Sequence, residues 1–312
     1  MGKEARSVLL INSGKKDMNN IFDEIKQSFY QGGTLIKLIY INLGVFLAFG
    51  ILKAILFLGG IDIGFTLSQY IAVPAHVPTL ATRPWTLITY MFFHEGFLHI
   101  LFNMLWLYWM GKIFLSFMTQ RELLGVYIMG GVSGGLLYIL FYNIFPAFSA
   151  SLPASYALGA SASVYAVVFA AVTYAPNLTL NLMFIGPVRL KYIGAVLVVL
   201  DVISIAGSNA GGHIAHLGGA LFGYLFIYFL KQNVNLAKPV YFVVDAFTSS
   251  PSTQRRKKMK VDHKKPKDDF EYNKVKAEQQ KEIDRILDKI SKGGYDSLTS
   301  EEKQTLFRMK GN

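Results

Sequence analysis

Three short motifs place serine, histidine and asparagine where their side chains could act on a carbonyl group. The first is the run GASASVY at residues 159–165, which contains Ser161 at the expected entry to a helix. Backbone N–H groups at a helix entry have no intrahelical partner and could stabilise an oxyanion beside a serine nucleophile. Taken alone, a run of glycine, alanine and serine is also typical of close packing between membrane helices.

The second motif, AHLGGALFG at residues 215–223, contains a histidine that could act as a base. Gly219 and Gly223 form a GxxxG pattern, which lets two helices approach closely. His216 lies about one turn before Gly219, on the same face of the predicted helix. A lone histidine there would more often be structural, but with a serine on the neighbouring helix it becomes a candidate general base.

The third motif, HEGFLHILFN at residues 94–103, contains two histidines and an asparagine. His99 and Asn103 are four residues apart and therefore share one helix face. Both side chains can donate hydrogen bonds, which suits the stabilisation of an oxyanion. Metal binding by His94 and His99 is an alternative, but it lacks a carboxylate or a further histidine at a matching spacing. We expect no metal and no cofactor.

The composition indicates that the motifs lie in a membrane. The 312 residues are 52% hydrophobic, yet the chain has a net charge of +11. Residues 251–312 hold 17 Lys and Arg and 11 Asp and Glu, whereas residues 34–231 hold eight basic and four acidic residues. A soluble domain is about a quarter charged, so residues 34–231 are interpreted as a polytopic membrane domain. The absence of cysteine excludes disulfides, cysteine-ligated zinc and thiol catalysis.

Six apolar segments near the length of a spanning helix predict an all-α membrane protein with a six-helix bundle. The segments are roughly 35–58, 96–118, 122–145, 156–175, 189–206 and 213–231. Basic residues gather in the N-terminal segment, near Arg121, near Arg189 and after residue 231, whereas the alternate loops hold only Arg83. This alternation predicts both termini in the cytoplasm. No signal peptide is expected, so the first apolar segment stays as a membrane helix.

The predicted topology brings the three motifs to one depth. The second, fourth and sixth segments all enter from the outer face of the membrane. His99, Asn103, Ser161 and His216 then lie near the outer ends of their helices. Packing residues would have no reason to share a depth, so we expect a joint site. Polar side chains inside a membrane also usually have a function.

Together the motifs resemble the rhomboid intramembrane serine proteases, over about residues 35–231. The family pattern is Gly-x-Ser at the start of a fourth helix, His-x-x-x-Asn in a second, and Ala-His-x-x-Gly-x-x-x-Gly in a sixth. The resemblance implies that Ser161 is the nucleophile and His216 the general base and later acid, in a dyad without an acidic third member. It also implies that His99, Asn103 and the backbone N–H of Ser161 bind the oxyanion.

The resemblance assigns supporting roles as well. Tyr165 matches an aromatic residue that packs on the catalytic imidazole, and Gly159 matches the first glycine of the serine motif. His94 matches a histidine of the first long loop, with a structural role. The fifth helix and the loop at 207–212 are expected to act as gate and cap. Asp201 of the fifth segment has no place in the dyad, and we expect a neutral or hydrogen-bonded structural carboxylate.

The chain departs from the family pattern at a few positions. Ala162 stands where the family usually has glycine, and its methyl group could restrict the backbone or the room for a substrate. Trp85 is followed by Thr86, where the family usually has arginine, and an acid common near the inner end of the second helix is missing. Ser163 is an alternative nucleophile, but the glycine and the tyrosine of the motif would then fall out of register.

Outside the membrane domain the sequence predicts three further segments. Residues 1–33 form a cytoplasmic N-terminal segment, 232–269 a basic flexible linker, and 270–312 a small helical cytoplasmic tail with a capping box at Thr299 to Glu302. The tail is either a solvated appendage or the binding site of a cytoplasmic partner. The basic cluster before it could also bind anionic lipid.

The expected activity is hydrolysis of a peptide bond in the transmembrane or juxtamembrane part of single-span proteins in the lipid bilayer. One alternative is a catalytically inactive rhomboid-like protein that binds membrane clients. Another is a transporter, for which only Asp201 offers a charge along a pathway. We expect no nucleic-acid partner, because the positive charge marks the cytoplasmic side and a basic appendage. No organelle targeting segment is visible, so a bacterial plasma membrane is expected.

Overall fold

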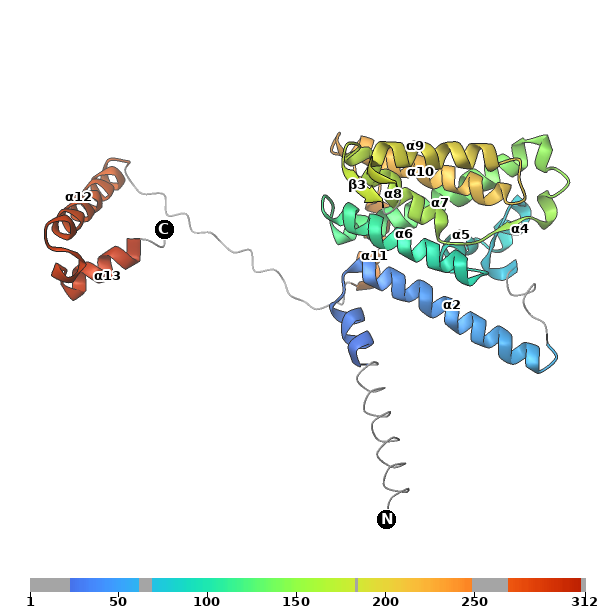
Figure 1. Ribbon diagram of the computed structural model, residues 1–312, viewed down its shortest axis with the longest axis horizontal. Coiled ribbons are helices and arrows are strands. Elements are labelled where there is room, and N and C mark those ends of the chain that lie inside the picture. Colours follow the sequence, from blue (N-terminus) through green and yellow to red (C-terminus); the bar gives the residue numbers. More distant parts are fainter. Residues whose placement is uncertain (1–22, 62–68, 183–184, 249–268, 310–312) are drawn as a thin grey trace, which may run out of the picture. The chain divides into compact units, whose positions relative to one another are not determined.

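The structure is a computed structural model that describes residues 23–61, 69–182, 185–248 and 269–309. It divides the chain into two compact units, Met1–Ser250 and Pro251–Asn312. Residues 23–31 are helical. The first unit contains the three motifs (Figure 1).

Each of the six predicted apolar segments is a helix. They are α2 (Thr34–Leu58), α6 (Phe97–Leu115), α7 (Gln120–Ile144), α8 (Ser161–Tyr174), α9 (Leu190–Ser204) and α10 (Ala210–Leu230). Among the described residues, α2, α6, α7 and α10 are long and apolar enough to cross a membrane. Helix α8 has 14 residues and α9 has 15, which is below the usual length of a span. Six spans and the orientation of the termini therefore stay predictions.

Helices α7, α8 and α10 pack closely because small residues line their contacts. A Cβ atom placed on Gly219 of α10 would lie 2.0 Å from the carbonyl oxygen of Ala162, and one on Gly223 would lie 2.3 Å from that of Ala166. The GxxxG face of α10 therefore rests directly on the backbone of α8. Helix α7 contributes Gly130, where a Cβ would lie 2.1 Å from the Cβ of Ala166.

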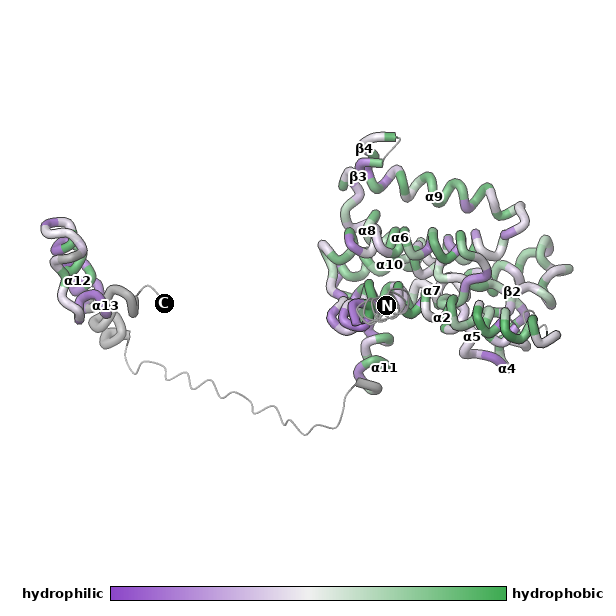
Figure 2. The backbone as a smooth tube through the Cα atoms, turned by 60° about the horizontal axis from the view of Figure 1, so that its bottom comes forward, coloured by the Kyte–Doolittle hydropathy of each residue, from purple (hydrophilic) through white to green (hydrophobic). Residues whose placement is uncertain are grey.

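Helices α2 and α9 lie on opposite sides of this group in both views (Figures 1 and 2). Many apolar side chains of the two helices are exposed, as expected of surfaces that face lipid. A polar contact attaches α2 to the rest of the unit. Asn42 is fully buried and its Nδ2 donates to the Leu38 carbonyl at 2.8 Å and to the Tyr127 hydroxyl at 3.0 Å. The Tyr127 hydroxyl donates to the Met91 carbonyl at 3.1 Å.

The long loop before α6 is built of short elements. They are β1 (Val73–Pro74), α4 (Val77–Thr82), α5 (Thr86–Thr89) and η1 (Tyr90–Phe92). Strand β1 pairs antiparallel with β2 (Tyr156–Ala157), which lies just before the serine motif. The N–H of Gly159 donates to the Tyr90 carbonyl at 2.9 Å. The loop therefore holds the backbone that leads into α8.

Several short elements complete the first unit. They are η2 (Pro146–Phe148), η3 (Leu152–Ala154), the antiparallel hairpin β3 (Thr179–Leu182) with β4 (Gly186–Arg189), and α11 (Lys238–Thr248). Helix α11 lies within the segment 232–269 that the sequence analysis assigned to a flexible linker. An ion pair between Arg121 and Asp245 attaches it to α7, and Ala237 fills the space above Gly125. Residues 249–268, with the predicted basic cluster, lie outside the described residues.

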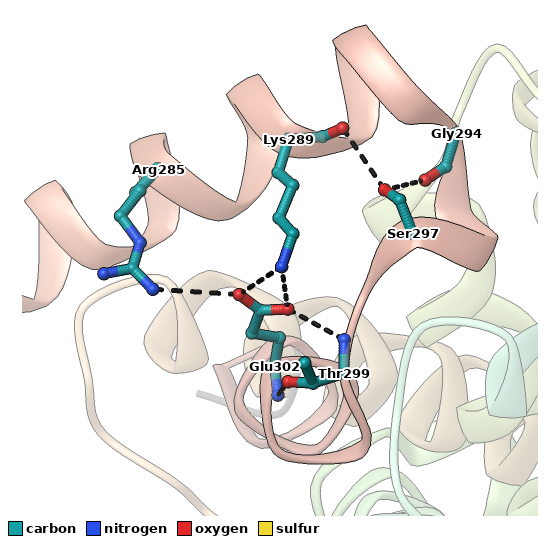
Figure 3. A network of polar contacts seen from close by, with 6 residues as sticks. All are labelled: Arg285, Lys289, Gly294, Ser297, Thr299 and Glu302. Carbon is teal, nitrogen blue, oxygen red and sulfur yellow. Dashed lines mark hydrogen bonds and ion pairs between the residues drawn. The ribbon is translucent and has the colours of Figure 1, made fainter.

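The second unit contains α12 (Asp269–Gly293), η4 (Tyr295–Ser297) and α13 (Ser300–Met309). The predicted capping box is present: the N–H of Thr299 donates to the Glu302 carboxylate at 2.8 Å, and the N–H of Glu302 to the Thr299 hydroxyl at 3.3 Å. Lys289 of α12 donates to both carboxylate oxygens, at 2.9 and 3.0 Å (Figure 3). These hydrogen bonds, with Lys289 first, lower the pKa of Glu302 to about 2.

Candidate active site

A cavity of about 1240 Å³ in the first unit brings the three motifs together. Residues of α2, α6, α8 and α10 form its walls, together with the loop before α10. The predicted site residues on its surface are Ser161, His216, His99, Asn103, Tyr165 and His94. The remaining predicted site residues, Gly159, Gly219 and Gly223, do not line the cavity. Residues from three distant parts of the sequence therefore share one space.

Ser161 is the first residue of α8. Its backbone N–H belongs to the first turn, where N–H groups have no intrahelical acceptor. Tyr165 follows one turn later on the same helix face. No hydrogen bond joins the Ser161 hydroxyl to the His216 ring within the described part of the chain. The structure thus gathers the predicted nucleophile and base without the hydrogen bond between them.

Two contacts fix the His216 ring. Tyr165 stacks on it, with ring centroids 4.3 Å apart and planes 16° from parallel. At the ring edge, Nδ1 lies 2.9 Å from Oδ1 of Asp201 on α9. When this carboxylate is ionised and the ring is neutral, Nδ1 carries the ring proton and Nε2 is left as an acceptor. His216 is therefore held in the form that a general base requires.

Sequence reasoning missed that Asp201 and His213 lie beside His216. We expected Asp201 to be a neutral or hydrogen-bonded structural residue, and it is hydrogen-bonded, but to His216 itself. His213, which the sequence analysis did not name, places its Nδ1 2.8 Å from the same carboxylate oxygen. The spacing of the two histidines was an available signal, because residues three apart share one helix face.

The same three side chains could also serve as metal ligands. One ligand atom each of Asp201, His213 and His216 lies within 4.8 Å of the others. Three protein ligands are what a catalytic zinc site uses. However, both nitrogen–oxygen distances are ordinary hydrogen-bond lengths, so N–H donors account for the geometry. The absence of a metal stays a prediction.

The predicted oxyanion donors lie on α6, close to the serine loop. A Cβ atom on Gly159 would lie 2.7 Å from Cε1 of His99, so the imidazole rests against the glycine. Gly159 also has φ of +125°, a conformation that residues with a side chain rarely adopt. The Nδ2 of Asn103 donates to the His99 carbonyl at 2.8 Å. One N–H of this amide therefore stays available to another acceptor.

His94 contacts the backbone of the loop that leads into Ser161. Its Nε2 lies 3.5 Å from the backbone N of Ala160, the residue before Ser161. Its ring meets the His99 ring edge to face, with centroids 5.1 Å apart. Burial, with a further contribution from His99, lowers the pKa of His94 to about 4. The ring is neutral at pH 7, so Nε2 can accept the Ala160 N–H.

Ala162, which departs from the family pattern, and Ser163, the alternative nucleophile, both lie away from the cavity. Ala162 is buried, and a Cβ on Gly134 of α7 would lie 2.4 Å from the Ala162 Cβ. The added methyl group is thus accommodated where α7 has a glycine. Ser163 is fully buried, and its hydroxyl lies 3.7 Å from the Met91 sulfur. Neither side chain lines the cavity.

Comparison with known proteins gives the family of this part of the chain. Residues 81–233 match the Rhomboid domain, and residues 268–309 match a family of unknown function (DUF6576). RHOMBOID-like protein 12, mitochondrial, of Arabidopsis thaliana is 32% identical over 148 residues, which cover 44% of this chain and 44% of that protein. Presenilin-associated rhomboid-like protein A, mitochondrial, of Danio rerio is 30% identical over 154 residues, covering 48% and 38%.

The matches to the two relatives cover only part of each protein. The chain aligns with less than half the length of either relative. Both relatives are named as mitochondrial, so they do not support the predicted bacterial plasma membrane. The matched domain begins after α2 and includes the serine, histidine and oxyanion motifs. Residues 81–233, which contain the three motifs, are therefore a rhomboid domain.

Proposed function

We propose that the chain is an intramembrane serine endopeptidase that cleaves transmembrane or juxtamembrane segments of single-span membrane proteins. The observation that supports this function is the gathering of Ser161, an oriented His216 and the His99–Asn103 pair around one cavity. A serine next to an oriented imidazole is the minimum arrangement for acyl transfer. The rhomboid domain gives the membrane context.

In the proposed reaction the Ser161 hydroxyl attacks the scissile carbonyl while Nε2 of His216 takes its proton. The tetrahedral oxyanion is stabilised by the backbone N–H of Ser161 and by the side chains of His99 and Asn103. The intermediate collapses when His216 returns the proton to the leaving amine, and an acyl-enzyme remains. Water then attacks the ester, with His216 again as the base. Hydrogen bonds of this kind are often loose before substrate binds.

The substrate must enter the cavity as an extended segment, because a helix hides the carbonyl of the scissile bond within its own hydrogen bonds. We propose that the substrate unwinds locally near the outer face of the bilayer. We propose that small residues are preferred at the cleavage point, because Gly159 and Ala160 come directly before Ser161. Water reaches the acyl-enzyme from the same face.

The test uses the purified full chain in liposomes with a labelled single-span substrate. Wild type should cleave it, whereas Ser161→Ala and His216→Ala should not. Ser163→Ala is the matched control: its hydroxyl faces Met91, so cleavage should persist. Activity should also be unchanged by a chelator. Cleavage by Ser161→Ala would show that the nucleophile is wrongly assigned, and loss of activity with the chelator would indicate a metal.

The alternative is an inactive rhomboid-like protein that binds membrane clients. The missing hydrogen bond between Ser161 and His216 is the observation in its favour. Reaction with a fluorophosphonate distinguishes the two, because only an activated serine is labelled. A client-binding protein would hold the model substrate without cutting it, and would not be labelled in wild type. A transporter has no support beyond Asp201, which is engaged by two histidines.

The compartment and the tail are separate proposals. A bacterial plasma membrane stays a prediction that fractionation of the source cells would test. We propose that the helical tail binds a cytoplasmic partner, or that the basic cluster before it binds anionic lipid. Binding of phosphatidylserine vesicles to the full chain held in nanodiscs of neutral lipid tests the proposed lipid binding, with a variant in which Arg255 to Lys258 are changed to alanine as the comparison.

A further inference from the structure

We propose that Asp201 is a positioning residue for His216, so that the site works as a serine–histidine–aspartate arrangement in which His213 shares the carboxylate. This inference rests on the proposed protease function and adds an acidic member that the family resemblance does not imply. Its basis is the position of one carboxylate oxygen, 2.9 Å from Nδ1 of His216 and 2.8 Å from Nδ1 of His213.

Proton counting restricts the states of this cluster. The oxygen can hold at most one proton, so it cannot donate to both imidazoles. At least one ring must donate its Nδ1–H, and when Asp201 is ionised both rings do so. In its neutral form His216 then has an unprotonated Nε2. An aspartate in this position selects the tautomer that accepts the serine proton and stabilises the imidazolium that forms.

Asp201 is buried and hydrogen-bonded to both histidines. The residue is 3% exposed, and it is the one ionisable residue among the three buried residues of α9. A buried carboxylate is costly unless hydrogen bonds stabilise its charge. His213, which lies outside the cavity lining, supplies a second N–H to this oxygen besides that of His216.

The contact also connects the base to a different helix. Tyr165 of α8 holds the face of the His216 ring, whereas Asp201 of α9 holds its edge. The two restraints are complementary, because stacking permits rotation within the ring plane and the hydrogen bond stops it. The orientation of Nε2 therefore depends on where α9 lies.

The first test reads the tautomer and needs no activity. The full chain is labelled with ¹⁵N-histidine in detergent, and the His216 signals are assigned by comparison with His216→Gln. Wild type should show a proton on Nδ1 and none on Nε2. Asp201→Leu should lose this preference. The proposal is overturned if His216 carries its proton on Nε2 in wild type, or if the tautomers are the same in Asp201→Leu.

The second test is kinetic and uses Asp201→Asn, which keeps the size of the side chain. We expect kcat to fall about 10²- to 10⁴-fold with KM little changed, as when the aspartate of a serine–histidine–aspartate triad is neutralised. His213→Leu should lower kcat less. Asp245→Asn, on the exposed ion pair of α11, is the control and should leave kcat unchanged. A purely structural aspartate would instead lower the amount of folded protein without changing kcat per folded molecule.

The two tests separate the proposals. If wild type neither cleaves nor reacts with a fluorophosphonate, the protease function fails, and the tautomer measurement still decides the role of Asp201. If wild type cleaves and Asp201→Asn is equally active, the protease function stands and the positioning role is wrong. If Asp201→Asn loses kcat and His216 changes tautomer, both stand.

Discussion

Helices α8 and α9 both contribute to the His216 environment, but they are attached in opposite ways. Helix α8 is packed by backbone contact, with its carbonyl oxygens under the glycines of α10. Helix α9 has mostly exposed side chains and buries Leu190, Gly194 and Asp201. The packing of α8 against α10 leaves no free space. Helix α9 instead contacts α10 near the site through the polar cluster of Asp201, His213 and His216. The serine is thus carried by a rigid interface, and the partner of the base by a loosely packed helix.

The largest effect should come from filling the rigid interface. In Gly219→Ala the new methyl group would meet the Ala162 carbonyl, so α8 and α10 must separate. We expect a loss of about 1–3 kcal/mol or more in the free energy of unfolding. Thermal unfolding in detergent measures it. Gly44→Ala in α2, where a Cβ meets nothing within 4 Å, is the control and should not be destabilised. Equal stability of the two variants would contradict close packing.

A smaller change in stability but a large change in rate is expected at Gly159. In Gly159→Ala the methyl group would push the His99 ring aside, and the backbone would be strained at φ of +125°. We expect cleavage to fall about 10²-fold, as for a displacement of about 1 Å at a reacting group. Gly96→Ala, which has open space, should retain activity. The interpretation fails if Gly159→Ala cleaves as fast as this control.

Acid should weaken the serine side of the site through His94. Its pKa is about 4 in the fold, below the ordinary value of 6.5, so the unfolded chain binds more protons between these values. The stability contributed by the neutral ring is present above pH 6.5 and is lost as pH falls towards 4. Unfolding midpoints measured from pH 7.5 to 4 should decline less steeply in His94→Asn than in wild type. If the unfolding midpoints of the two proteins decline in parallel, His94 is not a source of the acid sensitivity.

The smallest effect is expected on the outer face of α9. Val199 is more than half exposed, so Val199→Ala removes little packing. The change in stability should lie within about 0.5 kcal/mol. Activity should be unchanged as well, in contrast to Asp201→Asn two residues later. A strong loss of stability or activity in Val199→Ala would show that this exposed face of α9 is packed against another group.

The sequence predicted the helices and the gathered motifs better than it predicted their surroundings. Apolar runs determine where α2, α6, α7, α8, α9 and α10 form, and the spacing of Ser161 and Tyr165 follows from the helix repeat. The Asp201–His216 contact could not be derived in this way, because it depends on the rotation of α9 against α10. Likewise the methyl group of Ala162 is harmless only because α7 has Gly134 opposite it.

In the tail and in the segment after α10, too, local patterns were predictable and contacts between helices were not. The capping box at Thr299 is a local pattern and was predictable, whereas its use of Glu302 to bind Lys289 joins two helices. Helix α11 escaped prediction because its apolar run is short and is followed by a basic stretch. Its contact with Gly125 is a tertiary feature.

Helix α2 lies before the matched rhomboid domain, yet it supplies one wall of the cavity. Phe46, Phe49, Gly50 and Lys53 face the space that contains Ser161. Asn42 anchors this helix through Tyr127, away from the reacting groups. Residues of this wall can therefore change without disturbing the serine or the histidine. Natural variation in which substrates are accepted is expected to accumulate on α2, while the chemistry stays fixed on α8 and α10.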